Sequence, residues 1–291
     1  DQNSSGIHFE ILSNPEFLAE GTAIQDLFKS DRVLIGGEKT NSGQKAVKAL
    51  VDIYANWIPQ EKILTTNVWS SELAKLASNA MLAQRVSSIN SLSALCEKTG
   101  ADISELSKAI GMDHRIGPHF LRASVGFGGS CFQKDILNLV YLCKYYGLEE
   151  VAEYWHQVVK INDYQKDRYA QKIIDYFGGD LNGKTIAILG WAFKENTNDS
   201  RESPAIYVAE KLYKAGANLE IYDPKIKEDK ILKDISFYWK LNYSRSKIKI
   251  VKMLPKFHQI DSVAIITGWL EFKNLDFKKA KVFDGMNLLN K

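Results

Sequence analysis

A glycine-rich stretch that ends in a cysteine carries the residues best suited to chemistry. The sequence Ser124-Val-Gly-Phe-Gly-Gly-Ser-Cys-Phe-Gln-Lys-Asp135 leads from three glycines into Cys131 and an amphipathic segment. Glycines tolerate positive φ and let the backbone approach a ligand closely, and a helix beginning near Ser130 directs free N–H groups and its positive dipole end toward that ligand. We therefore expect the thiolate of Cys131 to be favoured and to act as a nucleophile.

Asp135 follows Cys131 by one helical turn, so both side chains should project from the same face of the expected helix. A second candidate face lies on the long helical segment predicted over residues 70–98, where Glu72, Lys75 and Asn79 share one stripe. The simpler alternatives are that Cys131 is a buried structural thiol and that the stripe is solvated surface.

The composition describes an ordinary globular chain that is large enough for two or three cores. The 291 residues include 38 Lys and Arg against 35 Asp and Glu, for a net charge of +3, and we expect neither a nucleic-acid nor a membrane partner. Cys96, Cys131 and Cys143 are too widely spaced for a disulfide framework or a metal pair, which favours a reducing, cytoplasmic setting and no metal. No signal peptide is visible, and the first residue is not Met, which suggests a trimmed product.

The fold class predicted from the elements is α/β, in three parts. Residues 1–67 read as part of a Rossmann sheet, with strands at 8–13, 32–36 and 62–66, a loop at 14–22 and a helix at 42–57. No G-x-G-x-x-G follows any strand, so this part is expected to be truncated.

The second part, residues 68–178, is predicted to be all-helical and to serve dimerisation. Its expected helices span 70–98, 102–110, 130–146 and 149–177, and the last is aromatic-rich, as in a domain bridge or a dimer core. The third part, residues 179–291, is predicted to be a Rossmann-like sheet that suits a mononucleotide or sugar nucleotide. Its strands start near residues 184, 218, 262 and 281, Ser203 and Pro204 should begin a helix, and the lysine-rich residues 225–258 are interpreted as variable surface.

Four motifs occur in a fixed order between about residue 11 and residue 224. They are Asn14-Pro-Glu-Phe-Leu-Ala-Glu-Gly-Thr-Ala, Glu72-Leu-Ala-Lys75-x-x-x-Asn79, Gly126-Phe-Gly-Gly-Ser-Cys131-Phe-Gln-Lys-Asp135, and Lys194 before Arg201-Glu-Ser-Pro. This set closely resembles the UDP-glucose 6-dehydrogenases of the UDP-glucose/GDP-mannose dehydrogenase family. The resemblance implies a four-electron oxidation of UDP-glucose to UDP-glucuronate, with two NAD+ used in turn. It also implies that residues 1–67 are the C-terminal part of an NAD-binding domain whose glycine-fingerprint half-sheet should precede Ile11, and that residues 179–291 bind the UDP-sugar.

The resemblance implies a role for each matching catalytic position. Cys131 is similar to the nucleophile that forms a thiohemiacetal and then a thioester. Lys75 resembles the residue that, with a water held by Asp135, handles the proton of the alcohol and stabilises the oxyanion, to which Asn79 adds a hydrogen bond. Glu16 resembles the carboxylate that activates water for thioester hydrolysis.

The resemblance also implies binding residues and partners. Positions that hold UDP and glucose are matched by Phe120, Leu121, Arg122, Phe127, Phe132 and Lys194. Arg115 resembles a residue that reaches a neighbouring subunit's active site, and Glu20 and Arg201 resemble residues that meet NAD. The expected partners are UDP-glucose and further copies of this chain, with a dimer as the smallest assembly and a hexamer as an alternative.

The sequence departs from the family pattern in the third part. Met286 stands after Phe283-Asp-Gly where an arginine is expected, and Gly268 in Thr267-Gly-Trp269 stands where an acidic residue is usual. The missing half-sheet would also remove the nicotinamide and adenosine pocket and a catalytic threonine. We therefore expect no turnover by this chain alone.

Three other interpretations compete with the dehydrogenase core. A dehydrogenase of another nucleotide sugar, such as GDP-mannose or UDP-N-acetylmannosamine, is opposed by the wording Cys-Phe-Gln-Lys-Asp. A non-catalytic oligomerisation module or inactive paralogue is favoured by Met286 and opposed by the intact Lys75, Asn79, Cys131 and Asp135. A thiol hydrolase would need a histidine partner for Cys131, and no motif supplies one.

Overall fold

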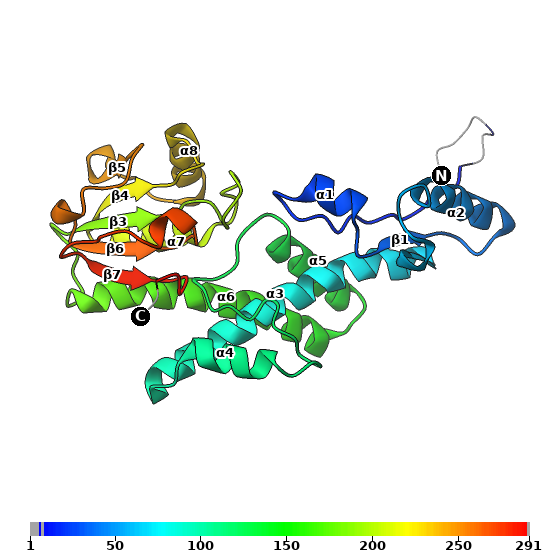
Figure 1. Cartoon of the computed structure of the whole chain (residues 1–291), viewed down its shortest axis with the longest axis horizontal. Coiled ribbons are helices and arrows are strands. Elements are labelled where there is room, and N and C mark those ends of the chain that lie inside the picture. Colours follow the sequence, from blue (N-terminus) through cyan, green and yellow to red (C-terminus); the bar gives the residue numbers. More distant parts are fainter. Residues whose placement is uncertain (1–5, 7–8, 290–291) are drawn as a thin grey trace. The chain divides into compact units, whose positions relative to one another are not determined.

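The computed structural model describes residue 6 and residues 9–289. The chain divides into two compact units, Asp1–Asn79 and Ala80–Lys291 (Figure 1). Parallel sheets and long helices confirm the predicted α/β class. The division at residues 67 and 178 stays a prediction.

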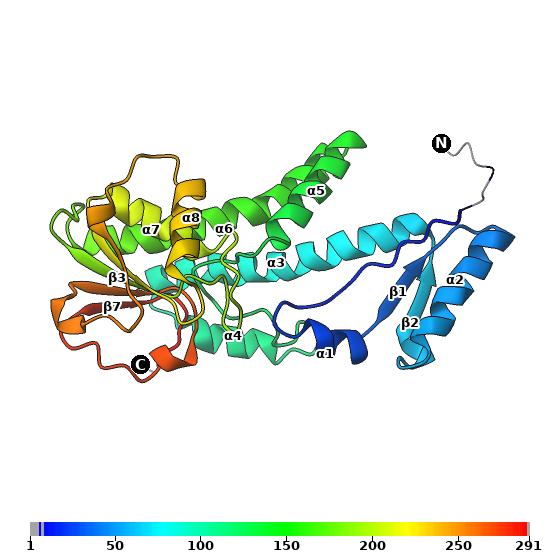
Figure 2. The same ribbon diagram turned by 90° about the horizontal axis from the view of Figure 1, so that it is seen from above.

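The first unit is built on a parallel β-α-β arrangement, as the sequence predicts. Its elements are α1 (Ala23–Phe28), β1 (Val33–Gly36), α2 (Asn41–Tyr54), η1 (Gln60–Lys62), β2 (Ile63–Thr66) and the beginning of α3 (Val68–Thr99). Val33 lies opposite Ile63 in a parallel register. Figure 2 shows α2 beside the two strands, and Val47 of α2 packs into the small core of β1. The helix therefore covers one face of a two-stranded sheet.

The strand predicted over residues 8–13 is wrong. His8 lies outside the described residues, and of residues 9–13 only Ser13 pairs, as an isolated antiparallel bridge to Gly36. Phe9 and Ile11 are exposed, so the apolar alternation of this segment meets no sheet face that could bury it. The expected loop over residues 14–22 is confirmed, and α1 follows it.

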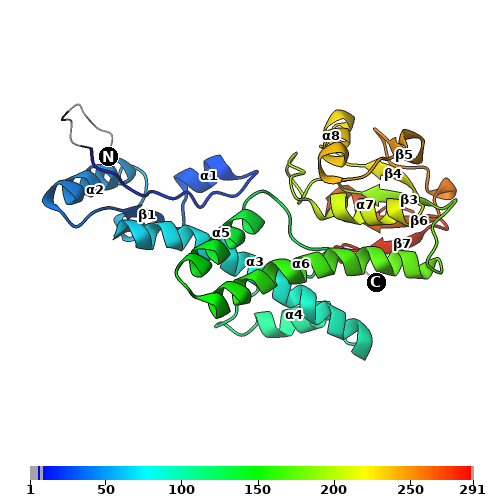
Figure 3. The same ribbon diagram turned by 180° about the vertical axis from the view of Figure 1, so that it is seen from behind.

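Four helices form the first part of the second unit, as the sequence predicts. They are the continuation of α3, then α4 (Ile103–Gly111), α5 (Phe132–Tyr145) and α6 (Glu149–Tyr176). The Asp102 carboxylate caps α4 by accepting from the N–H groups of Ser104 and Glu105. Figure 3 shows α5 and α6 side by side, and Ile136 of α5 and Val159 of α6 share one apolar core. This helical layer carries the nucleophile candidate at the start of α5.

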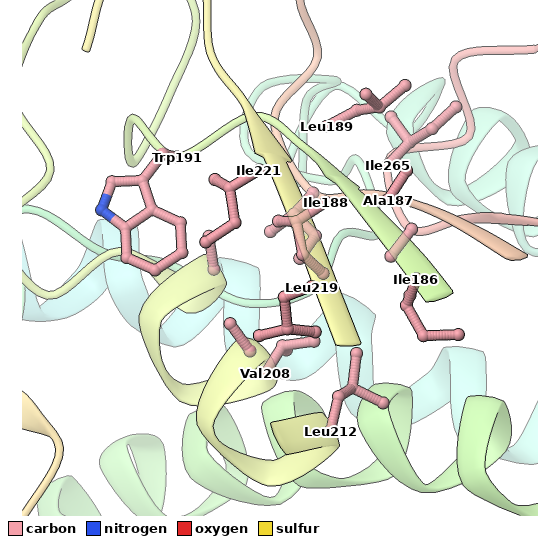
Figure 4. Close-up of a cluster of buried hydrophobic side chains, with 14 of the residues drawn as sticks. Ile186, Ala187, Ile188, Leu189, Trp191, Val208, Leu212, Leu219, Ile221 and Ile265 are labelled. Atoms are coloured by element: carbon pink, nitrogen blue, oxygen red, sulfur yellow. The ribbon is translucent and has the colours of Figure 1, made fainter. Parts of the chain in front are cut away.

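A five-stranded parallel sheet completes the second unit, in the order β5-β4-β3-β6-β7. Its elements are β3 (Thr185–Leu189), α7 (Pro204–Lys214), β4 (Asn218–Tyr222), α8 (Glu228–Tyr238), η2 (Arg245–Lys247), β5 (Ile248–Ile250), η3 (Phe257–Gln259), β6 (Ser262–Ile265), η4 (Leu270–Phe272) and β7 (Lys281–Asp284). Ser203 caps α7 with Pro204 as its first residue, as predicted. Figure 4 shows Val208 and Leu212 of α7 next to Leu219 of β4, all buried. The Rossmann-like prediction is confirmed.

The interpretation of residues 225–258 as variable surface is wrong. This segment contains the edge strand β5 and the helix α8, whose Ile231 and Ile235 are fully buried in the main core. Trp239, at the end of α8, donates its indole N–H to the carbonyl of Ile206 in α7. The many lysines make the apolar face of this helix hard to recognise in the sequence. In the structure their long side chains reach solvent from the borders of that face.

Candidate active site

Cys131 is the N-cap residue of α5, at the point where the glycine stretch ends. Its side chain is exposed, whereas Cys96 and Cys143 are buried, so the alternative of a buried structural thiol does not hold for Cys131. The hydroxyl oxygen of Ser130 lies 3.7 Å from the Cys131 sulfur, close enough to hydrogen-bond with it. A thiol at a helix N-terminus beside a hydroxyl is well placed to act as a nucleophile.

The glycines of this stretch are required by close packing within the chain. Gly126 has a φ of +126°, and a Cβ placed there would lie 2.7 Å from the amide oxygen of Asn162. A Cβ at Gly128 would lie 2.5 Å from the carbonyl oxygen of Glu202. Any larger residue would push the stretch away from α6 or from the loop before α7. The predicted close approach to a ligand stays a prediction, and within the chain the groups that lie close to these glycines are Asn162 and Glu202.

Helix α6 holds the glycine stretch through two buried amides. The Asn162 side chain accepts from the Phe127 N–H at 2.8 Å and donates to the Phe127 carbonyl at 3.0 Å. Gln165, one turn later, donates to the Ser124 carbonyl at 2.6 Å. These bonds satisfy the backbone of an irregular segment where no sheet or helix could do so. Sequence reasoning missed both amides, and their i, i+3 spacing on the packing face of an aromatic helix was the signal available.

Asp135 lies one turn after Cys131 and is buried. Its N–H donates to the Cys131 carbonyl at 2.9 Å, and Lys134 lies 3.9 Å from its carboxylate. The Phe127 and Phe132 rings meet edge to face at 5.7 Å. The structure thus places the two phenylalanines in contact, and it buries Asp135 whereas Cys131 is exposed. The roles expected for these residues stay predictions.

The loop between β3 and α7 carries the candidates Lys194 and Arg201. The Arg201 carbonyl accepts from the Gly129 N–H at 2.8 Å, which fastens this loop to the nucleophile stretch. The Arg201 guanidinium forms an ion pair with Asp199 at 2.7 Å, and the Lys194 ammonium lies 5.6 Å from the Phe193 ring centre. Both cations thus sit on one loop beside the cysteine segment.

A buried carboxylate at the carboxyl end of β4 organises the same edge of the sheet. Asp223 accepts from the backbone N–H groups of Trp191 and Ala192 at 2.7 and 2.9 Å, and from the indole N–H of Trp269 at 3.1 Å. These partners follow β3 and β6, so one carboxylate joins three strand ends. Ligands of parallel sheets bind at this edge.

The segment of Phe120, Leu121 and Arg122 is held by a residue that sequence reasoning missed. The guanidinium of Arg85 in α3 donates to the carbonyls of Ile116, Gly117 and His119, each at 2.9 Å. Phe120 is exposed in the left-handed region at a φ of +60°, whereas Leu121 is buried. A planar donor fork is suited to binding several carbonyls of one loop at once.

Arg115 projects from the same loop with its side chain 78% exposed. It pairs with Asp113 at 2.6 Å, and this hydrogen bond lowers the pKa of Asp113 and raises the pKa of Arg115. The guanidinium of Arg115 lies at the surface of the described part of this unit, and its expected role in a neighbouring copy stays a prediction.

The two departures from the family pattern lie next to each other in space. Arg122 donates to the Met286 carbonyl at 3.0 Å. A Cβ on Gly268 would lie 3.7 Å from the Met286 methyl, 3.8 Å from the Arg122 guanidinium and 3.6 Å from the Glu195 carboxylate. Arg122 and Glu195 thus supply a cation and a carboxylate where Met286 and Gly268 supply none.

The first unit contains its own group of candidates. Lys75 of α3 donates to the Glu16 carbonyl at 2.7 Å and lies 3.1 Å from the Glu16 carboxylate, whose other oxygen accepts from the Leu18 N–H. Asn79, one turn after Lys75, is buried, and Glu20 is exposed. The structure brings Lys75 and Glu16 together, although they are far apart in sequence.

Comparisons with known proteins divide the chain into three successive domains of one family. Three domain models of one family match the chain: the NAD binding domain at residues 1–58, the central domain at 69–164 and the UDP binding domain at 187–291. The chain belongs to the UDP-glucose/GDP-mannose dehydrogenase family. The resemblance found in the four sequence motifs is confirmed, and the match to the NAD binding domain makes NAD the cofactor of this family member.

Curated relatives in the family are close in sequence. UDP-glucose 6-dehydrogenase 1 of Glycine max is 54% identical over 308 residues, which cover 99% of this chain and 64% of the relative. UDP-glucose 6-dehydrogenase 3 of Arabidopsis thaliana is 55% identical, with the same coverage. A solved UDP-glucose dehydrogenase from the archaeon Pyrobaculum islandicum has a TM-score of 0.84 at 33% identity and covers 98% of this chain and 63% of its own. The chain thus spans less than two thirds of the length of these family members.

The described residues show neither a metal cluster nor a membrane-spanning helix. Within residue 6 and residues 9–289, no group of three or more His, Cys, Asp or Glu side chains could hold a metal ion. None of the helices described is both long and apolar enough to cross a membrane.

Proposed function

We propose that this chain is the core of a UDP-glucose 6-dehydrogenase that oxidises UDP-glucose to UDP-glucuronate. The observation that carries the proposal is the exposed Cys131 at the N-terminus of α5, held by α6 beside the carboxyl edge of a parallel sheet. The motifs and the high identity to curated enzymes of that name support the substrate. Because the chain covers 64% of those relatives, the proposal concerns the activity of the whole protein.

In the proposed reaction, the Cys131 thiolate adds to the C6 aldehyde to form a thiohemiacetal, whose oxidation gives a thioester. Lys75 and Asp135, through a water held by the latter, take the proton of the substrate alcohol, and Asn79 donates a hydrogen bond to the oxyanion. Glu16 then activates the water that hydrolyses the thioester. Its carboxylate accepts from Lys75 and from the Leu18 N–H, and these two bonds fix its orientation.

NAD would accept the hydrides in this reaction. The residues present fit it in part. The parallel β-α-β arrangement of β1, α2 and β2 is the architecture that binds nucleotides, but neither strand is followed by a G-x-G-x-x-G turn. Glu20 and Arg201 are the residues of this chain proposed to meet the cofactor. We accordingly keep the prediction that the chain alone does not turn over.

The UDP-sugar would bind at the carboxyl edge of the five-stranded sheet. Lys194 and Arg122 offer cations for the pyrophosphate, and Phe120, Leu121, Phe127 and Phe132 line the adjoining segments. Arg122 is held at its Nε atom by the Met286 carbonyl, which leaves the outer nitrogens of its guanidinium pointing away from that bond. This arrangement supports diphosphate binding despite the absence of an arginine at 286.

Two other candidate functions are less well supported. The first is a dehydrogenase of another nucleotide sugar. A solved UDP-D-ManNAc dehydrogenase from Pyrococcus horikoshii is 22% identical to this chain, and at that identity the likeness supports the fold alone. A non-catalytic module would not need an exposed thiol on a stretch fixed by two buried amides.

Calorimetric titration of the chain with UDP-glucose, in the absence of NAD, tests the proposal. We expect saturable binding of UDP-glucose with a Kd of roughly 10–100 μM, weaker by about tenfold in Lys194→Met because a charge-assisted hydrogen bond is lost. GDP-mannose is the control and should give no saturable heat. Equal binding of both sugars, or of neither, would contradict the proposed substrate.

We also propose that the chain forms a homo-oligomer. Tyr141 and Tyr145 are 64% and 70% exposed on one face of α5, and their rings stack at 6.4 Å. Exposed tyrosine rings are enriched at protein interfaces. Sedimentation equilibrium should give at least twice the monomer mass of 32.9 kDa, and Tyr141→Lys combined with Tyr145→Lys should give the monomer. Phe237→Lys, which changes an equally exposed ring on α8, should leave the mass unchanged. A wild-type monomer at high concentration would refute the assembly.

A further inference from the structure

Three side chains that the proposed reaction does not use contact one another in series, and the backbone of the last residue lies against the glycine stretch. They are Lys166, Tyr207 and Glu202. Lys166 of α6 is buried, with its side chain 4% exposed and its ammonium 3.0 Å from Asp163. The same ammonium lies 4.3 Å from the centre of the Tyr207 ring on α7. Tyr207 in turn donates its hydroxyl to the carboxylate of Glu202. A buried lysine, an aromatic ring and a carboxylate are thus linked in sequence.

Glu202 occupies a conformation that needs support. Its φ is +53°, in the left-handed region that costs a non-glycine residue roughly 1 kcal/mol or more. Its N–H faces the Tyr238 hydroxyl at 3.4 Å, a weak contact, and its carboxylate accepts from the Tyr207 hydroxyl and also interacts with the Tyr238 hydroxyl. Burial and the hydrogen bond to Glu202 raise the pKa of Tyr207, which therefore remains a donor at neutral pH.

The glycine stretch packs against the backbone of Arg201 and Glu202. The Arg201 carbonyl accepts from Gly129, and the Glu202 carbonyl lies so close to Gly128 that a Cβ there would be 2.5 Å away. Cys131 follows these glycines directly. A rotation of the left-handed Glu202 would therefore move the acceptor of Gly129 and release the segment that leads to the thiol.

Close packing does not hold the Tyr207 ring on its other side. Tyr207, Lys166 and Gln133 of α5 border a hollow of about 270 Å³, together with Asp163 and Asp167. The ring thus has space beside it, and its other contacts include Lys166, Glu202 and the Tyr238 ring, whose centre lies 6.0 Å away. Removal of the hydroxyl changes one bond without creating a clash or a large cavity.

We propose that Tyr207 is a positioning residue that, through Glu202, holds the glycine stretch and so fixes the location of Cys131. The catalytic consequence rests on the proposed function, in which Cys131 is the nucleophile. The positioning itself can be measured in this chain without any turnover.

Hydrogen exchange of the glycine stretch tests the positioning role. In Tyr207→Phe we expect the amide of Gly129 to exchange roughly fivefold faster, because a hydrogen bond to a charged group that held its acceptor, the Arg201 carbonyl, in place is lost. Exchange in β3 should stay within about twofold of wild type, since the core is untouched. Tyr213→Phe is the matched control: it removes a hydroxyl from the same helix, one that accepts from the Ser244 N–H at 2.7 Å, and should leave residues 126–131 unchanged.

Substitutions of Glu202 provide the second test. Glu202→Gln keeps a carbonyl acceptor for the Tyr207 hydroxyl, so its exchange should stay as slow as in wild type. Glu202→Ala removes the acceptor, so its exchange should be as fast as in Tyr207→Phe. Unchanged exchange in Tyr207→Phe, or equal acceleration in Tyr213→Phe, would overturn the inference. If exchange responds as expected but the full-length protein has no dehydrogenase activity, the proposed function fails and the positioning role stands. If both hold, Tyr207→Phe should lower kcat and leave KM within about twofold, because the substrate cations are untouched.

Discussion

Replacing Cys131 by serine is expected to lower the oxidation of UDP-glucose to UDP-glucuronate by about a thousandfold or more, in a protein that carries the full length of its relatives. A hydroxyl at this position remains protonated at neutral pH and is a far weaker nucleophile toward the aldehyde. UDP-glucose binding should stay within about threefold of wild type, because the cations proposed for the pyrophosphate are unchanged. Coupled NADH formation and calorimetry measure the two quantities.

The same variant has a readout that needs no activity. Cys131 is exposed, and Cys96 and Cys143 are buried, so iodoacetamide should alkylate one thiol quickly in the native chain and none in Cys131→Ser. Cys96→Ser is the control and should still be alkylated at Cys131. If Cys131→Ser retained full oxidation activity, the covalent mechanism would be wrong even with the family assignment intact.

Replacing Asp223 by alanine is expected to lower the free energy of unfolding of the second unit by roughly 3–5 kcal/mol. The carboxylate accepts from the N–H groups of Trp191 and Ala192 and from the indole of Trp269, and all three donors are buried. Alanine leaves these donors unpaired in a low-dielectric core. Urea unfolding followed by tryptophan fluorescence measures the loss directly.

Asp229→Ala separates this effect from the general loss of an acidic residue. Asp229 lies in the first turn of α8 and is exposed, so its removal should cost no more than about 1 kcal/mol through the helix dipole. A similar cost at both positions would show that Asp223 does not organise the strand ends. UDP-glucose binding should also weaken in Asp223→Ala, since the loop after β3 carries Lys194.

Much of the local structure could be predicted from the sequence, because its signals lie within a few residues of the structure they specify. Asp102 and Ser203 cap helices through N–H groups two or three residues away, and the long helices α3 and α6 contain no internal glycine or proline. The wrong predictions concern segments whose structure depends on residues that are distant in the sequence. The segment predicted as a strand has a suitable composition, but within residues 9–13 the structure forms a single β-bridge, at Ser13. The apolar face of α8 is obscured in the sequence by lysines, and it becomes evident only when the fold buries Ile231 in the main core.

For the site, the sequence by itself determined which residues could do chemistry. The glycines, Cys131 and Asp135 are adjacent along the chain, and the order of the motifs identified the family. Only the tertiary structure decided what holds them. Asn162 binds Phe127 across 35 residues, and Asp223 binds Trp269 across 46. Such bonds form only when folding brings distant segments together and removes water from both, so no local pattern in the sequence records them.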